Sequence, residues 1–159
     1  MTSVLHFGAD SAAGMERRLV VRMLKYWRSL IENGARRPGM NRINPETLAD
    51  SRDWCYALDF SESEDDPIIR FAGHGYFDDL DSDPVGCRLS EINSDSLLRY
   101  ATTYFPDAVR KAVPVTFGGE FNGEDGTRTL YRSVILPLDD ENGTFSILFG
   151  AANYRRDPA

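Results

Sequence analysis

The C-terminal third of the chain holds the feature that most constrains its fold, a pattern for a β-hairpin between Thr127 and Ala152. The dipeptide Asn142-Gly143 favours a two-residue type I′ turn, because both central residues of that turn need positive φ. With this turn, Glu141 lies opposite Thr144. Three apolar pairs then share one face of the ribbon: Leu138 with Ile147, Leu136 with Phe149, and Val134 with Ala151. This face is therefore predicted to be buried.

The opposite face of the hairpin is also apolar, and its members are Tyr131, Ile135, Pro137, Leu148 and Tyr154. An apolar area of this extent is rarely left to water. We therefore expect helices to cover both faces of the hairpin. The middle helices, between Ser94 and Ala112, are expected over the first stripe, and an N-terminal helix over the second.

The length, cysteine count and net charge of the chain restrict the kind of protein it can be. Its 159 residues are enough for one domain with a sizeable core. Two cysteines are too few for a disulfide scaffold, and no N-terminal segment resembles a signal peptide. No window approaches the roughly 18 apolar residues of a membrane span, and the net charge of -7 disfavours nucleic acid. We expect a cytoplasmic protein with no membrane insertion and no nucleic-acid partner.

The N-terminal part predicts a tail and one long helix. Residues 1–10 lack periodicity and are expected to be flexible. A helix is expected from Ser11 to Asn33, ending at Gly34. Apolar residues recur every four positions along it: Met15, Leu19, Met23, Trp27 and Ile31. This stripe is either a homodimer face or part of the intramolecular core, and both interpretations stay open.

The middle of the chain predicts three more strands and several short helices. The strands are expected at Trp54–Phe60, at Ile68–Gly73 and from Val115 to Phe121. Helices are expected after Asn44-Pro45, from Ser94 to Tyr104, and from Pro106 to Ala112.

An aspartate-rich segment, Asp78 to Asp83, has the alternation of an EF-hand calcium loop at its start. Pro84 and Ser90 then occupy positions that need glycine and a bidentate carboxylate. We therefore favour a solvated turn and assign no metal site.

Short motifs spread from Trp27 to Ala152 have a characteristic order and spacing. They are Trp27 with Gly34 and Pro38, Asn44-Pro45 with Leu48, Arg70-Phe71-Ala72-Gly73, Asp83 with Gly86, Leu89 and Glu91-Ile92, and Leu136-Pro137-Leu138 with Leu148-Phe149-Gly150-Ala151. This pattern resembles that of bacterial stand-alone PAS-domain proteins, although His74 and Ser82 depart from it. The resemblance implies an α+β fold, with a five-stranded antiparallel sheet and helices over one face. The division is then a tail (1–10), a long N-terminal helix (11–34) and a PAS-like domain (35–155).

The same resemblance implies a role in signalling, in which a ligand or partner shifts the sheet and its flanking helix. The chain carries no kinase, cyclase or DNA-binding segment. Its output is therefore expected through a protein partner of a signalling pathway or through homodimerisation, with or without a small ligand. The alternative is a chemosensor that binds an acidic metabolite between the sheet and the helices.

We expect neither a catalytic site nor a cofactor. Nucleotide-binding glycine loops and nucleophile elbows are absent. Haem-binding PAS members use a histidine of the helix facing the sheet, and Ser94–Ala112 contains none. Light-sensing flavin members place a reactive cysteine in an Asn-Cys-Arg-Phe-Leu-Gln run, to which Gly86-Cys87-Arg88-Leu89 is only faintly similar. The two cysteines and two histidines match no zinc spacing.

The candidate ligand pocket consists of His74, Tyr100, Tyr104, Phe117 and Arg132. Arg132 lies on the first apolar stripe, opposite Asn153, and a buried cation needs an anion. It is either an anchor for an acidic metabolite or, as we favour, an exposed residue paired with a carboxylate such as Glu120.

Overall fold

The structure, a computed structural model, describes residues 3–5, 14–31, 34–123 and 126–157. Its strands form one antiparallel sheet in the order β1-β4-β5-β6-β2-β3. The strands are β1 (Ser3–Leu5), β2 (Cys55–Asp59), β3 (Ile68–Ala72), β4 (Val115–Asn122), β5 (Arg128–Asp139) and β6 (Phe145–Asp157).

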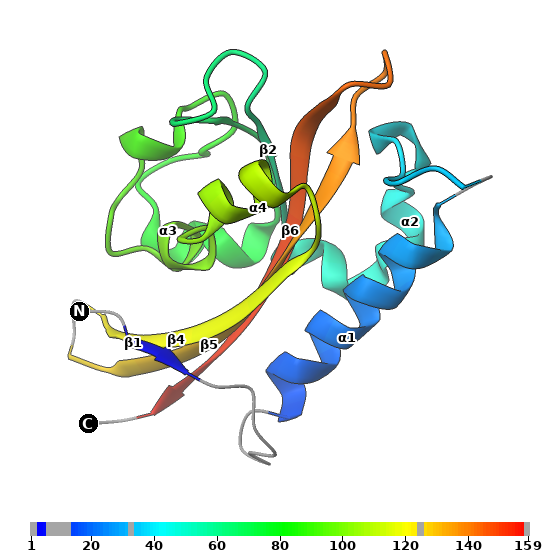
Figure 1. The fold of residues 1–159 in the computed structure, drawn as a ribbon. Coiled ribbons are helices and arrows are strands. Elements are labelled where there is room, and N and C mark those ends of the chain that lie inside the picture. Colours follow the sequence, from blue (N-terminus) through cyan, green and yellow to red (C-terminus); the bar gives the residue numbers. More distant parts are fainter. Residues whose placement is uncertain (1–2, 6–13, 32–33, 124–125, 158–159) are drawn as a thin grey trace.

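The helices lie on both sides of this sheet (Figure 1). They are α1 (Gly14–Ser29), α2 (Pro45–Leu48), α3 (Leu97–Ala101) and α4 (Phe105–Lys111), with four 3-10 turns: η2 (Met40–Arg42), η3 (Ala49–Trp54), η4 (His74–Asp79) and η5 (Leu89–Glu91). Helix α1 covers one face, whereas α3 and α4 cover the other (Figure 1). No helix in the described ranges is both long and apolar enough to span a bilayer.

The strand order β4-β5-β6-β2-β3 is the five-stranded antiparallel arrangement expected of a PAS domain, and the α+β, PAS-like fold class is confirmed. A sixth strand, β1, lies within the segment expected to be a tail. It pairs with β4, and Val4 lies opposite Gly119. Three residues are too few to show the alternation that predicts a strand from sequence.

The C-terminal hairpin has its predicted register but not its predicted turn. Gly143 has a φ of 79°, whereas Asn142 is not among the described residues with positive φ, so the turn is not type I′. Asp140 N–H instead donates to Thr144 O at 2.7 Å and closes a three-residue loop. Ser146 is then left unpaired as a bulge, which shifts the pairing by one residue. The three predicted apolar pairs, Leu138–Ile147, Leu136–Phe149 and Val134–Ala151, are confirmed.

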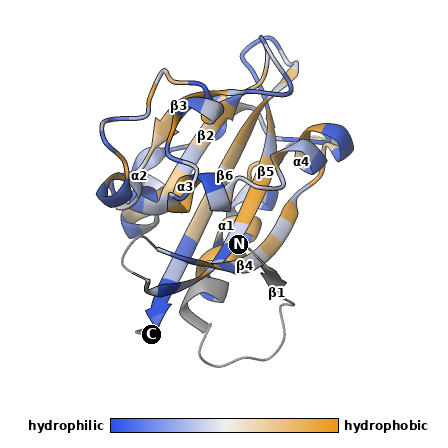
Figure 2. Cartoon of the chain, turned by 90° about the vertical axis from the view of Figure 1, so that its left-hand side faces the viewer, coloured by the Kyte–Doolittle hydropathy of each residue, from blue (hydrophilic) through white to orange (hydrophobic). Residues whose placement is uncertain are grey.

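The helices cover the opposite faces from those we predicted. The stripe containing Val134 and Leu136 packs against α1, and we call this side the α1 face. The side containing Tyr131, Ile135 and Leu148 packs against the short helices, and we call it the α3/α4 face. The hairpin shows that both faces need cover, but its residues do not say which helix takes which face. Figure 2 shows how hydrophobic residues follow the central strands while the C-terminal end of β6 is hydrophilic.

Helix α1 belongs to the intramolecular core, which corrects its assignment as a dimer face. Leu19, Met23 and Trp27 are all buried against β5 and β6. Trp27 also donates from Nε1 to Pro137 O at 2.8 Å. Ile31 is half-buried against the same cluster, and the side chain of Met15 lies outside the described residues.

Short helices begin where polar side chains can cap them. The Asn44 side chain accepts from Glu46 N at 3.0 Å, as expected, and Pro45 follows it. Helix α3 begins later than predicted, because the cap is Ser96, whose hydroxyl accepts from Arg99 N at 3.3 Å.

Candidate functional site

Three of the five predicted pocket residues lie together on the α3/α4 face. Tyr104 packs edge-on against Phe117 with their ring centroids 4.8 Å apart. Tyr100 stacks on Phe121 at 4.1 Å, and the ring of Tyr131 lies 6.3 Å from that of Tyr100. Because these rings contact one another, they form an aromatic layer rather than the wall of an open pocket.

The other two predicted pocket residues lie elsewhere. His74 is exposed at the start of η4, where its ring contacts Phe77. Arg132 is buried, so the expected exposed strand end is wrong. It alternates with Val134 along β5 and therefore points to the α1 face, away from Tyr100. The anchor for an acidic metabolite between sheet and helices is thus corrected, because the cation and the aromatic rings are on opposite sides of the sheet.

Tyrosine rings fill the space between the sheet and α3. A Cβ atom added at Gly150 would lie 2.2 Å from Cζ of Tyr56, which shows that this ring lies directly over the glycine. Tyr131 covers Gly119 in the same way. Tyr56 Oη donates to Ala101 O at 3.2 Å and so ties the sheet to the end of α3. Burial raises the pKa of Tyr56 and raises that of Tyr131 to about 12, so both rings stay neutral.

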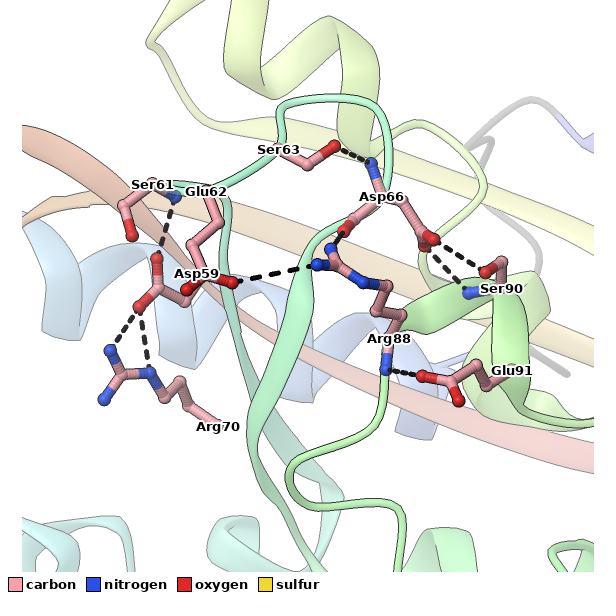
Figure 3. Close-up of polar contacts among 9 residues, drawn as sticks. All are labelled: Asp59, Ser61, Glu62, Ser63, Asp66, Arg70, Arg88, Ser90 and Glu91. Carbon is pink, nitrogen blue, oxygen red and sulfur yellow. Dashed lines mark hydrogen bonds and ion pairs between the residues drawn. The ribbon is translucent and has the colours of Figure 1, made fainter.

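The acidic loop between β2 and β3 is held by polar contacts (Figure 3). A bulge in β3 leaves Arg70 unpaired in the strand register, and its guanidinium binds the buried Asp59 carboxylate. Burial alone would raise the pKa of Asp59, but hydrogen bonds from Ser61 and the Arg70 ion pair outweigh it and lower that pKa.

Further polar contacts tie the β2–β3 loop to η5. Arg88 donates to Asp66 O at 3.1 Å, and Asp66 accepts from the Ser90 hydroxyl at 2.7 Å. Hydrogen bonds from Ser90, together with nearby cations, lower the pKa of Asp66. Arg88 N–H also donates to Glu91 at 2.7 Å. Both the guanidinium and the backbone N–H of Arg88 therefore have hydrogen-bond partners within the protein.

A cavity of about 370 Å³ lies where η4 and the start of α3 meet the C-terminal ends of β4 and β6 and the N-terminal end of β5. Four aspartates line it: Asp78, Asp79, Asp81 and Asp95. Phe121, Thr129 and Tyr154 form the wall on the sheet side, and Arg156 is the one cation among the described residues that line the cavity. Sequence analysis missed this site, because its residues come from five separate segments. The only signal in the sequence is the Asp78–Asp83 run, whose pattern favours a solvated turn.

The Asp79 carboxylate is the most buried of the four. One of its oxygens accepts from Leu97 N at 2.8 Å. Burial raises the pKa of Asp79, although the Leu97 N–H and the charge of Arg156 oppose the shift. Within the described residues, no group of three or more His, Cys, Asp or Glu side chains is placed to hold a metal ion.

The outward side of α1 carries a second charged surface, of opposite sign. Arg18, Arg22, Lys25 and Arg28 are all exposed there, and Val21 between them is 43% exposed. We call these five residues the basic α1 surface. Across the described part of the chain, none of its four cations has an ion-pair partner within 4.0 Å.

No protein-family model matches this sequence, and no curated protein matches it significantly. Among solved structures, the chain is similar to the light state of the blue-light photoreceptor Aureochrome1 LOV. The two are 16% identical with a TM-score of 0.47, and the match covers 69% of this chain and 87% of the other. It is also similar to the light-state dimer of the fungal blue-light photoreceptor Vivid, at 14% identity, a TM-score of 0.42, and coverage of 94% and 97%. Likeness at this level concerns the fold, which is PAS-like.

Our expectation of a domain without a cofactor is contradicted, because both of these solved structures are named as blue-light photoreceptors. The residues of the α3/α4 face nevertheless do not fit a flavin as they stand. A planar ring system would have to lie where the rings of Tyr56 and Tyr76 are completely buried. Cys87 is half-buried, and its carbonyl accepts from Ile69 N in a strand-like contact. Arg88 is already bonded to Asp66.

Proposed function

We propose that this protein is a non-catalytic regulatory domain of the PAS type that acts through a protein partner bound at the basic α1 surface. The observation that carries the proposal is the charge of that surface. Arg18, Arg22, Lys25 and Arg28 project from one side of a helix whose other side is fixed to the sheet. A helix held in this way presents its cations in a defined geometry, which suits recognition of a partner.

The partner is expected to be an acidic protein surface. The chain as a whole has a net charge of -7, so a polyanion such as nucleic acid would be repelled by most of the molecule. A compact acidic surface can instead contact the basic α1 surface alone. Val21 adds an apolar contact in the middle of the cations.

The absence of catalysis is part of the proposal. The Cys55 thiol is completely buried and its pKa is raised to about 12, mainly by that burial, so it is a poor nucleophile. His74, the histidine within the described residues, is exposed and contacts an aromatic ring rather than a nucleophile.

Four further assignments are carried forward as proposals. They are a bacterial origin within the single-PAS family, a cytoplasmic location, a homodimer that uses a surface other than the buried side of α1, and the division into 1–10, 11–34 and 35–155. The motifs from Trp27 to Ala152 support the first of these.

Site-specific photo-crosslinking tests the proposed partner surface. A photo-reactive amino acid at Val21 should capture a protein whose crosslinked peptide is rich in Asp and Glu. The matched control is Val113, which is 49% exposed and lies beyond α4 on the other side of the sheet. The double variant Arg22→Glu, Lys25→Glu should abolish the Val21 product. The proposal is wrong if Val21 and Val113 capture the same proteins, if Val21 captures only a second copy of the chain, or if charge reversal has no effect.

A further inference from the structure

The cavity bounded by η4, α3 and the far strand ends has the charge of a cation-binding site. Among the described residues that line it, the aspartates Asp78, Asp79, Asp81 and Asp95 face one cation, Arg156. Across the described residues, none of the four carboxylates has an ion-pair partner within 4.0 Å. Several carboxylates around one semi-enclosed space raise the local concentration of cations.

Two polar side chains of the cavity can still accept hydrogen bonds from a ligand. Thr129 lines it and is only 4% exposed, and its hydroxyl has no hydrogen bond within the described structure. The hydroxyl of Thr129 is therefore available to a ligand in the cavity. Asp79 is half-buried, and its bond from Leu97 N occupies one carboxylate oxygen. A ligand that donates hydrogen bonds would satisfy both side chains.

The arrangement of these groups selects an organic cation over a metal ion. No three acidic side chains of the described chain approach closely enough to hold a metal. The remaining wall includes Phe121, Leu97 and the ring of Tyr154. Carboxylates spread around a partly apolar wall match a molecule with separated ammonium groups joined by a hydrocarbon chain, because each ammonium group can pair with a carboxylate while the chain packs against apolar atoms. A volume of about 370 Å³ is within the range of small-molecule sites.

We infer that this cavity binds an aliphatic di- or triamine, with one ammonium group at Asp79 and Thr129 and another at Asp95. The hydrocarbon chain lies against Tyr154 and Phe121. The inference is independent of the partner surface proposed on α1, because the two surfaces share no residue.

Calorimetric titration of the whole protein with spermidine tests the inference. Spermidine should bind at one site, and glutamate at equal concentration should not. Asp79→Asn keeps the acceptor for Leu97 N but removes the charge, and Thr129→Val removes only the hydroxyl. Each should weaken binding by about tenfold, the usual effect of losing one charge-assisted hydrogen bond. Asp65→Asn, an exposed acid of the β2–β3 loop, is the matched control and should bind normally.

Three results would overturn the inference. The first is no spermidine binding, and the second is equal weakening in Asp65→Asn and Asp79→Asn, which would indicate general attraction to an acidic protein. The third is displacement of spermidine by millimolar calcium, which would indicate a metal site. If Asp79→Asn fails to fold by circular dichroism, Asp95→Asn takes its place, since Asp95 is exposed.

Discussion

The two faces of the sheet are closed by different means. On the α1 face, one amphipathic helix supplies Leu19, Met23 and Trp27, and a nearby buried carboxylate, Asp59, is paired with Arg70. On the α3/α4 face, several short segments meet over a layer of aromatic rings, and a cavity with unpaired carboxylates remains where those segments end. A single long helix covers its face continuously, whereas short segments leave space at their junctions, and that space is available for a ligand.

The largest expected effect comes from placing a charge on the buried side of α1. Met23→Asp should cost more than about 4 kcal/mol and unfold the domain, because the carboxylate would be buried without a partner. Chemical denaturation followed by circular dichroism measures this. Val21→Asp, on the outward side of the same helix, should change stability by less than about 0.5 kcal/mol. A folded but monomeric Met23→Asp protein would instead restore the dimer interpretation.

The next largest effect is expected from a substitution that pushes against the aromatic rings of the α3/α4 face. Gly150→Ala should destabilise the fold by about 1–3 kcal/mol, because the new Cβ collides with the Tyr56 ring. Thermal unfolding of the single and double variants measures the coupling. Tyr56→Leu should cost stability by itself, but the added cost of Gly150→Ala should largely disappear in that background. Full additivity of the two substitutions would mean that the ring does not lie over Gly150.

A smaller effect concerns the paired carboxylate of the α1 face. Asp59→Asn should lower stability by about 1–2 kcal/mol at neutral pH, since it removes a charge-assisted contact with Arg70. Because the folded-state pKa of Asp59 is lowered, its stabilisation is complete above its unfolded pKa, about 4. It is lost as the pH falls through the folded pKa. Wild-type and variant stabilities should therefore converge in acid, and parallel pH profiles would contradict the pairing.

The smallest effect, of opposite sign, concerns the cavity. The folded-state pKa of Asp79 is raised, so its ionised form opposes folding above the unfolded pKa. Asp79→Asn should raise stability at neutral pH by less than about 1 kcal/mol, because the group is partly solvated. The gain should vanish as the pH falls and wild-type Asp79 becomes protonated. Thermal unfolding at neutral and acidic pH measures the gain. A loss of stability on substitution would show that an unrecognised cation already pairs with Asp79.

The features that sequence analysis predicted correctly are those that repeat along a single segment. The pairing of Leu136 with Phe149 follows from alternation, and it survived a wrong turn type because the Ser146 bulge compensates for the three-residue loop. The burial of Leu19 and Met23 follows from helical periodicity, although we left open whether they meet the same chain or another.

The features that sequence analysis missed depend on contacts between segments. Which helix covers which face of the sheet is decided by connections that no local pattern records, so Arg132 was placed on the wrong side. The bulge that turns Arg70 toward Asp59 has no glycine or proline to mark it. The cavity brings Asp79 and Tyr154 together from positions 75 residues apart along the chain.

The hairpin strands β5 and β6 contain 12 and 13 residues, so each extends about 40 Å at roughly 3.3 Å per residue. One part of this ribbon accepts the Trp27 hydrogen bond at Pro137, and the far end contributes Thr129 and Tyr154 to the cavity. The helix and the cavity therefore rest on the same two continuous backbones.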